Sequence, residues 1–184
     1  MARLVVTQNM TLDGRIEMLD SWFDPSPDAG VDDLQEEMDR QGSATSAMLL
    51  GRQTFEDFRG YWPQHTDEPA GASLERLQKY VVSRTLGDPG WVNTTVLDGD
   101  PLEEARSLVA AVDGDLVVTG SITLTHALLE AGLVDELRLF VHPAVQGRGR
   151  GLTPDGVALP DLSLLESRSF RAGVTLLSYA VRAA

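Results

Sequence analysis

The stretch Met48-Leu49-Leu50-Gly51-Arg52-Gln53-Thr54-Phe55-Glu56 joins an apolar run to a polar segment typical of a helix start. The apolar run ends at Gly51, where the missing Cβ lets another backbone or a ligand come close. Thr54 is a candidate N-cap, with Asp57 three residues later as its partner. Helix N-termini favour anions, and the planar guanidinium of Arg52 suits phosphate oxygens. The stretch therefore predicts either an ordinary strand-turn-helix unit with a surface arginine or a phosphate-binding turn.

Segments on both sides of this stretch repeat the order of strand and helix. Short apolar runs that are rich in β-branched residues predict strands at 3–8, 46–50, 79–83, 93–97, 116–119 and 137–141. Apolar residues at helical spacing, with Asp-Pro at a helix start and Gly at helix ends, predict helices at 31–41, 54–60, 73–78, 100–112 and 122–131. Two late segments, 162–170 and 174–182, predict an antiparallel hairpin that turns at Gly173.

This order of elements predicts an α/β fold with a mixed, mostly parallel sheet flanked by helices. Alternating strands and helices form βαβ units, whose helices cover both faces of a parallel sheet. The C-terminal hairpin adds antiparallel strands at one edge of the sheet. A length of 184 residues fits one domain, so we expect residues 1–184 to fold as a unit.

Composition and charge exclude several classes of function. The formal net charge of -13 argues against nucleic-acid binding, which needs a basic surface. The chain has no cysteine, which excludes disulfides and cysteine nucleophiles and fits a reducing compartment. No apolar run reaches the roughly 18–20 residues of a membrane span, and the N-terminus lacks the features of a signal peptide. We therefore expect a cytoplasmic protein that binds neither nucleic acid nor membrane.

Three predicted strands end in similar polar sequences. These strand ends lead into Gly51-Arg52-Gln53-Thr54, Ser83-Arg84-Thr85 and Thr119-Gly120-Ser121. Ligands of parallel α/β sheets bind outside the carboxyl ends of the strands. Two arginines and several hydroxyl groups at three such ends predict one anion-binding edge, although each end alone is also an ordinary turn.

Other kinds of site have less support in the sequence. The phosphate loops G-x-x-x-x-G-K-[ST] and G-x-G-x-x-G are absent after the strands, as is the nucleophile elbow G-x-S-x-G. His65, His126 and His142 are the only histidines and lack metal-ligand spacing, so we expect no metal site. Trp22 and Phe23 lie in an acidic loop, where they either anchor the loop to the core or line a ligand cleft.

Taken together, these motifs resemble the dihydrofolate reductase-like family that includes the C-terminal reductase domain of bacterial riboflavin biosynthesis. The resemblance covers nearly the whole chain and rests on Thr11-Leu12-Asp13-Gly14, 49–56, Tyr61-Trp62-Pro63, Val82-Ser83-Arg84, Gly120-Ser121, 128–137 and 173–179. It implies a single-domain dihydrofolate reductase-like fold and an NADPH-dependent reductase that passes hydride to a small pterin- or pyrimidine-like heterocycle. It also implies a homodimer, for which the late strands offer a sheet edge and apolar side chains.

The resemblance further implies roles for particular residues. Cofactor contacts fall on Gly14, Gly51, Arg52, Thr54, Ser83, Arg84, Thr119, Gly120, Ser121 and Thr123. Asp13 is the candidate catalytic acid or substrate-orienting residue beside the nicotinamide, and the alternative is that it only caps its turn. Substrate contacts fall on Trp22, Asp24, Phe55 and Trp62.

Two departures from the family pattern affect the choice of substrate. The helix that carries the pterin-binding carboxylate in dihydrofolate reductases has no evident counterpart, because the corresponding region is the acidic loop 22–28. Leu152-Thr153-Pro154 stands where the family usually has phenylalanine, and the 184 residues contain no deaminase domain. The alternative function is a dinucleotide-binding module without turnover, which acts as a sensor or partner subunit. Oxidation of NADPH with a panel of pterins, pyrimidines and quinones separates the two.

Overall fold

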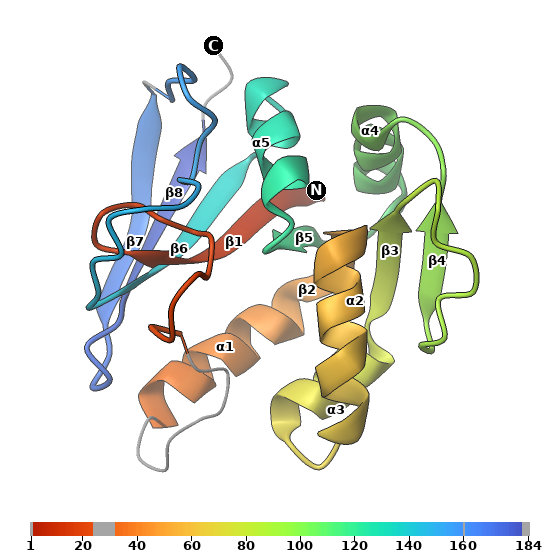
Figure 1. Cartoon of the computed structure of the whole chain (residues 1–184), viewed down its shortest axis with the longest axis horizontal. Helices are drawn as coiled ribbons and strands as arrows, with labels where there is room; N and C mark the ends of the chain where they lie inside the picture. Colours follow the sequence, from red (N-terminus) through yellow and green to blue (C-terminus); the bar gives the residue numbers. More distant parts are fainter. Residues whose placement is uncertain (1, 24–31, 160, 182–184) are drawn as a thin grey trace.

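A computed structural model describes residues 2–23, 32–159 and 161–181. Eight strands in these residues are β1 (Arg3–Thr11), β2 (Thr45–Gly51), β3 (Gln78–Val82), β4 (Thr94–Leu97), β5 (Asp115–Thr119), β6 (Glu136–His142), β7 (Leu162–Ser169) and β8 (Thr175–Val181). They form one sheet in the order β4-β3-β2-β5-β1-β6-β8-β7 (Figure 1). Strands β1 to β6 pair in parallel, whereas β8 pairs antiparallel with β6 and β7. The predicted mixed sheet with a C-terminal hairpin at its edge is therefore confirmed.

Helices cover both faces of this sheet. Within the described residues they are α1 (Asp32–Ala44), α2 (Arg52–Tyr61), the 3-10 helix η1 (Trp62–Gln64), α3 (Pro69–Arg76), α4 (Pro101–Ala111) and α5 (Ile122–Glu130). On one face Leu49 of β2 clusters with Leu108 of α4 and Leu128 of α5. On the other face Met48 clusters with Phe55 of α2, because successive strand residues point to opposite faces. No helix in the part of the chain that the structure describes has the length and apolar character needed to cross a bilayer.

Parallel pairing places the polar strand ends next to one another. In a parallel sheet the carboxyl ends of neighbouring strands lie at the same edge. Strand β2 lies between β3 and β5, so Gly51 at the end of β2, Ser83 after β3 and Gly120 after β5 lie at three adjacent strand ends. The three motifs, which are separate in the sequence, therefore lie together at the carboxyl ends of the strands.

The start of α2 differs from the sequence-based expectation. Thr54 is not the N-cap, because β2 continues to Gly51 and the helix begins directly after it at Arg52. Gly51 occupies the N-cap position with an extended backbone and no side-chain cap. The predicted cap of α4 is confirmed, since Asp100 accepts hydrogen bonds from the backbone N–H groups of Leu102 and Glu103.

Lys79, the only lysine of the chain, is fully buried in β3. Its Nζ donates hydrogen bonds to the carbonyl oxygens of Leu74 and Leu77, both at 2.7 Å. The same nitrogen lies 4.4 Å from the centroid of the Trp91 ring, a favourable cation–π distance. Desolvation lowers the pKa of Lys79 to about 8, although nearby Glu75 acts in the opposite direction. Lys79 thus ties the C-terminus of α3 to β3. Because its pKa is lowered, its ammonium group loses the proton at a lower pH than an exposed lysine does.

The variant Lys79→Met should remove a pH dependence of stability. The pKa of Lys79 is about 8 in the folded chain, and lysine in an unfolded chain titrates near about 10.4. Between these values the unfolded state binds more protons, so the free energy of unfolding rises with pH, by up to about 3 kcal/mol in total. Urea unfolding across this range should show the rise in the wild type and not in Lys79→Met. An equal rise in both proteins would exclude Lys79 as its source.

Candidate functional site

Two helix N-termini meet at the carboxyl edge of the sheet. The backbone N–H of Gly51, just before α2, donates a hydrogen bond to Oγ of Ser121, just before α5, at 2.9 Å. The N–H of Ser121 in turn donates to Oγ1 of Thr54 in the first turn of α2, at 2.8 Å. These two bonds hold the starts of α2 and α5 against each other.

Neither of these N-termini carries a cap or an acidic residue of its own. Gly51 and Ser121 make no side-chain cap bond to the helices that they precede, and the first turns of α2 and α5 contain no acidic residue. Helix α4 shows the contrast, because Asp100 caps it and Glu103 and Glu104 lie in its first turn. Free N–H groups and the positive ends of two helix dipoles favour an anion. The paired N-termini of α2 and α5 therefore form a candidate anion site.

Arg52 extends from the start of α2 to the loop after β3. Its Nη1 donates a hydrogen bond to Oγ1 of Thr85 at 2.6 Å, and its Nε forms an ion pair with Glu56 one turn along the helix at 2.8 Å. The side chain is still about half exposed, so phosphate oxygens can reach the guanidinium. Arg52 thus links two of the three predicted strand ends.

The loop after β3 supplies one side chain that shapes the turn and one that is exposed. Oγ of Ser83 accepts hydrogen bonds from the backbone N–H groups of Thr85 at 3.3 Å and Leu86 at 3.0 Å. Arg84, the next residue, is exposed. Ser83 therefore fixes the loop, and Arg84 is accessible to an anionic group.

The turn between β5 and α5 has an unusual backbone. Gly120 and Ser121 both adopt left-handed conformations, with φ of 55° and 44°, and this region is sparsely populated for residues other than glycine. A Cβ on Gly120 would lie 3.0 Å from Cγ2 of Thr54. Buried Gln8 of β1 holds the turn from the other side, because its Nε2 donates to the carbonyl oxygen of Gly120 at 2.6 Å. The remaining predicted cofactor residues in this region, Thr119 and Thr123, flank the turn.

Asp13 and Gly14 form the turn after β1, and Gly14 has the positive φ of 77° that this turn requires. The Asp13 carboxylate accepts hydrogen bonds from Oγ1 of Thr11 at 2.6 Å and from the backbone N–H groups of Gln146 at 3.1 Å and Gly147 at 2.7 Å. These bonds, first of all that from Thr11, lower the pKa of Asp13 to about 2. Asp13 is therefore ionised at neutral pH and ties its turn to the loop after β6. Its catalytic role stays a prediction.

Aromatic side chains gather at the ends of β1 and β6. His142, the last residue of β6, makes T-shaped contacts with Trp22 and Phe23, at 5.4 and 5.6 Å between ring centroids. Its Nε2 lies 3.0 Å from Oδ1 of Asn9, so Nε2 carries the proton and Nδ1 is an acceptor. Burial lowers the pKa of His142, which keeps the ring neutral at pH 7. Nε1 of Trp22 donates to Oε1 of Gln146 at 2.7 Å, and this bond holds the indole at the sheet edge.

Two of the predicted substrate residues lie away from this edge. Phe55 is fully buried, and its ring centroid lies 6.0 Å from that of Trp91 in the core. Trp62 follows the C-terminus of α2, about 15 Å of helix rise from Gly51. Phe55 is therefore a core residue, whereas Trp62 is partly buried against the same cluster and its substrate role stays a prediction. A third expected contact, Asp24, lies outside the described residues.

Sequence similarity places the chain in a known family. The sequence model of the RibD C-terminal domain family matches residues 2–176. The protein YyaP of Bacillus subtilis (strain 168) is 31% identical over 185 residues, which cover 96% of this chain and 94% of YyaP. The chain belongs to the RibD C-terminal domain family.

Solved structures share the fold at low sequence identity. A pyrimidine reductase-like protein from Corynebacterium diphtheriae superposes with a TM-score of 0.65 at 15% identity, over 99% of this chain and 92% of that protein. RibD from Acinetobacter baumannii superposes with a TM-score of 0.69 at 15% identity, over 100% of this chain and 59% of RibD. At these identities the likeness concerns the fold alone, and it confirms the predicted α/β fold of the riboflavin-reductase type.

The variant Asp13→Asn should loosen the loop after β6. Asparagine keeps the shape of the side chain but has one acceptor oxygen in place of two, so it loses the bond from either Gln146 or Gly147. Hydrogen exchange at one of these two amides should be faster in the variant, while exchange at Leu49 in the core stays at the wild-type rate. Because the pKa of Asp13 is about 2, the wild-type loop should loosen only as the pH falls from about 4 towards 2. Unchanged exchange at both Gln146 and Gly147 would show that this carboxylate does not hold the loop.

Proposed function

We propose that the chain is an NADPH-dependent reductase that transfers hydride to a small pterin- or pyrimidine-like heterocycle. Membership of the RibD C-terminal domain family supports a reductase. The paired, uncapped N-termini of α2 and α5 are the observation that carries the cofactor part of the proposal. The pyrophosphate bridge of a dinucleotide presents the anionic charge that such N-termini bind.

The local charges fit an anionic cofactor although the whole chain has a net charge of -13. Salt screens distant carboxylates over about 8–10 Å, so the groups beside the phosphates dominate the binding. At the proposed site these groups are two helix N-termini without acidic first-turn residues, Arg84, and Arg52 with its ion-pair partner Glu56.

Each residue of the edge has a role in this proposal. Backbone N–H groups that follow Gly51 and Ser121 would hold the pyrophosphate, and Arg52 would bind one of its oxygens. Arg84 would bind the 2′-phosphate that distinguishes NADPH from NADH. NADPH supplies the hydride, while the side chains of the chain orient the reactants and exclude water.

The aromatic cluster would form the substrate side of the site. Trp22 and Phe23 offer flat apolar surfaces for a heterocycle. Neutral His142, fixed by Asn9, leaves Nδ1 to accept a hydrogen bond from an N–H or O–H group of the substrate. Ionised Asp13 would orient the substrate. If Asp13 is catalytic, Asp13→Asn keeps NADPH binding and loses on the order of 10²-fold in turnover.

The variant Gly51→Ala should weaken NADPH binding without unfolding the chain. Gly51 has a φ of −77°, which alanine adopts, and a Cβ there would lie 3.7 Å from the Ser121 side chain, an ordinary contact. The added methyl group would instead keep a phosphate away from the backbone. We expect at least about a tenfold rise in Kd by isothermal titration, or about 1.4 kcal/mol, and a comparable rise in Arg52→Ala. In Arg84→Ala the preference for NADPH over NADH should fall.

The matched control for this experiment is Gly60→Ala. Gly60 lies in the same helix, and a Cβ there would meet nothing within 4 Å. Its affinity for NADPH should equal that of the wild type. Equal affinity in the wild type, Gly51→Ala and Arg52→Ala would remove the proposed cofactor site. Oxidation of NADPH with pterins, pyrimidines and quinones tests turnover separately from binding.

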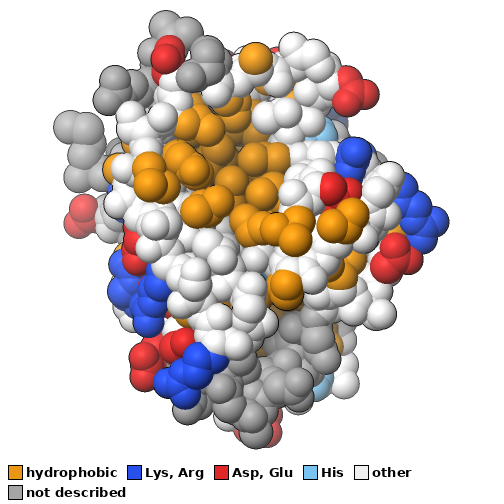
Figure 2. Space-filling model, turned by 90° about the vertical axis from the view of Figure 1, so that its left-hand side faces the viewer, with side chains coloured by type: hydrophobic (Ala, Val, Ile, Leu, Met, Phe, Trp, Pro, Cys, Tyr) orange, Lys and Arg blue, Asp and Glu red, His pale blue; other side chains and the backbone are white. Residues whose placement is uncertain are grey.

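We also propose that two copies of the chain associate through β7 and β8. Strand β7 is the edge of the sheet, and its Leu162 and Leu164 are 38% and 56% exposed. Their partners across the ladder, Val181 and Tyr179 of β8, continue the same face. Figure 2 shows hydrophobic side chains gathered on the side of the molecule where β7 and β8 lie. An apolar face beside an unpaired sheet edge suits an isologous contact with a second copy.

The variant Leu164→Asp should convert this dimer into a monomer, because a buried carboxylate without a partner opposes association. Light scattering should give twice the chain mass of 20.0 kDa for the wild type and 20.0 kDa for the variant. Leu12→Asp is the control, since Leu12 is 67% exposed but lies in the turn after β1. A wild-type mass of 20.0 kDa at all concentrations would contradict the dimer.

A further inference from the structure

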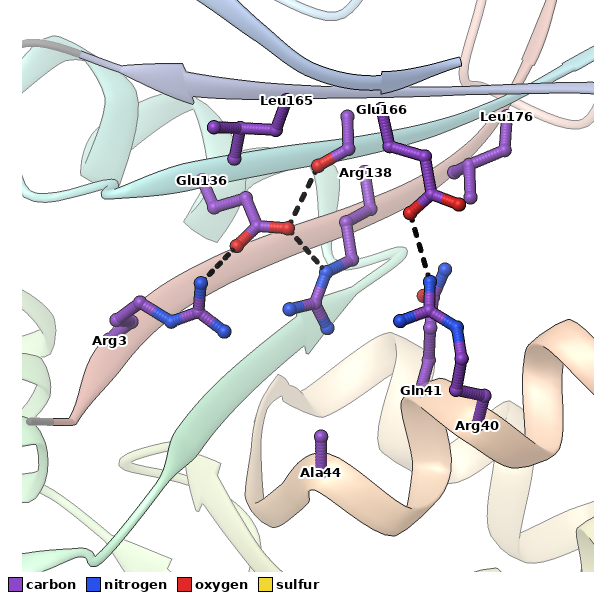
Figure 3. A pocket seen from close by; sticks show the side chains of 10 residues that line it. Arg3, Arg40, Gln41, Ala44, Glu136, Arg138, Leu165, Glu166 and Leu176 are labelled. Carbon is purple, nitrogen blue, oxygen red and sulfur yellow. Dashed lines mark hydrogen bonds and ion pairs between the residues drawn. The ribbon is translucent and has the colours of Figure 1, made fainter. Parts of the chain in front are cut away.

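A cavity of about 210 Å³ lies between α1 and the sheet (Figure 3). Arg3 and Glu136, which begin β1 and β6, line it together with Arg138 of β6 and Arg40 of α1. The candidate cofactor site lies at the carboxyl ends of the strands, whereas this cavity lies towards their amino ends. The two sites are therefore separate.

The sheet side of the cavity is built from buried ion pairs. Only 9% of the Arg138 side chain is exposed, and its Nε and Nη2 donate to Glu136 and Asp115, both at 2.7 Å. Arg3 donates to the same two carboxylates, at 2.6 Å to Glu136 and 2.9 Å to Asp115. The hydroxyl of Ser178 donates to Glu136 at 2.9 Å. Both carboxylates are thus already occupied by several donors.

The helix side of the cavity repeats this arrangement around a third buried carboxylate, that of Glu37. Nε and Nη2 of Arg40 donate to Glu37 at 2.9 and 2.6 Å, and Nη2 also donates to Glu166 of β7 at 3.0 Å. Glu37 is fully buried. Figure 3 shows the guanidinium groups of Arg3, Arg138 and Arg40 around the open space between the sheet and α1.

The arginines around the cavity have donors to spare. A guanidinium carries five N–H donors, and the carboxylate bonds of Arg138 and Arg40 use Nε and Nη2. Nη1 of each makes no hydrogen bond to any residue in the part of the chain described by the structure. Arg138 is 9% exposed and Arg40 is 58% exposed, so water can reach both Nη1 groups and a ligand can replace that water. A ligand with acceptor oxygens would therefore find two guanidinium donors that no carboxylate of the described residues occupies.

We propose that this cavity binds a small oxyanion, a carboxylate or phosphate group whose oxygens accept hydrogen bonds from Nη1 of Arg138 and Arg40. Planar guanidinium groups match the oxygen geometry of both anions. Leu165 and Leu176 form an apolar part of the wall, so a short apolar body on the anion also fits. Since carboxylates already balance the guanidinium charges, directed hydrogen bonds carry the recognition. The expected Kd is on the order of 1 mM.

Nitrogen-15 NMR of the arginine Nε–H groups tests the proposal, because each arginine gives its own signal. Inorganic phosphate and butyrate, titrated separately, should move the Arg138 and Arg40 signals in a saturable way. Movement by phosphate alone assigns a phosphate ligand, and movement by butyrate alone assigns a carboxylate with an apolar body. Either result supports the site. No saturable movement of either signal with either anion at roughly 10 mM would overturn it.

Matched variants locate the binding. Arg40→Ala should raise the Kd measured at the Arg138 signal by about tenfold or more, the scale of a lost charge-assisted bond. Arg106→Ala is the control, since Arg106 pairs with Glu103 at the i,i+3 spacing that Arg40 shares with Glu37, and it should leave the Kd unchanged. Arg138→Met is less informative, because the buried carboxylates beside it would lose a partner and the chain could unfold.

Phosphate can also bind at the proposed cofactor site, and the variant Arg52→Ala separates binding there from binding in the cavity. That variant should lose phosphate binding at the N-termini of α2 and α5 while the Arg138 titration stays unchanged. A Kd at Arg138 that changes with Arg52→Ala but not with Arg40→Ala would also overturn the proposal. Neither of these negative results bears on the proposed reductase function, because that function rests on the site at the carboxyl ends of the strands.

Discussion

The parallel pairing of β2 with β5 is the interaction on which the candidate site depends. The two strands run in the same direction, so the helices that follow them start at the same edge, and the N–H of Gly51 reaches Ser121 at 2.9 Å. A slip of one residue would turn every side chain of β2 to the opposite face. Met48 would then leave the cluster that it forms with Phe55. The packing of the core on both faces thus sets the geometry of the site.

The sequence predicts the elements and their order well, because hydrophobic periodicity and turn residues are local signals. It does not predict contacts that depend on strand register. Oγ1 of Thr54 finds its donor 67 positions away, and Asn9 meets His142 across 133 positions. The placement of Phe55 is different, since its spacing of seven from Trp62 already indicates one face of a helix. That helical spacing predicts a core position for Phe55, whereas the resemblance to the family motif predicts a substrate contact.

A chain with a negative net charge can bind an anion at a place where acidic residues are absent from the helix N-termini. The contrast lies between helices that all follow parallel strands and therefore begin at the same, carboxyl side of the sheet. Helix α4 has Asp100 as its cap and two glutamates in its first turn, which satisfy its N-terminus within the chain. Helices α2 and α5 have neither, although 28 of the 184 residues are acidic. The distribution of charge along the helices therefore bears more directly on the proposed anion site than the net charge does.

Ion pairs hold the amino ends of the central strands in register. Arg3 of β1 bonds Asp115 of β5 on one side and Glu136 of β6 on the other, so one guanidinium spans three adjacent strands. Loss of one partner would leave a buried charge uncompensated, which is strongly destabilising, and the network therefore resists any shift in register. With the register held at the amino ends, the loops at the carboxyl ends do not have to stabilise the sheet. Those loops can therefore adopt sparsely populated backbone conformations, such as the left-handed pair at Gly120 and Ser121.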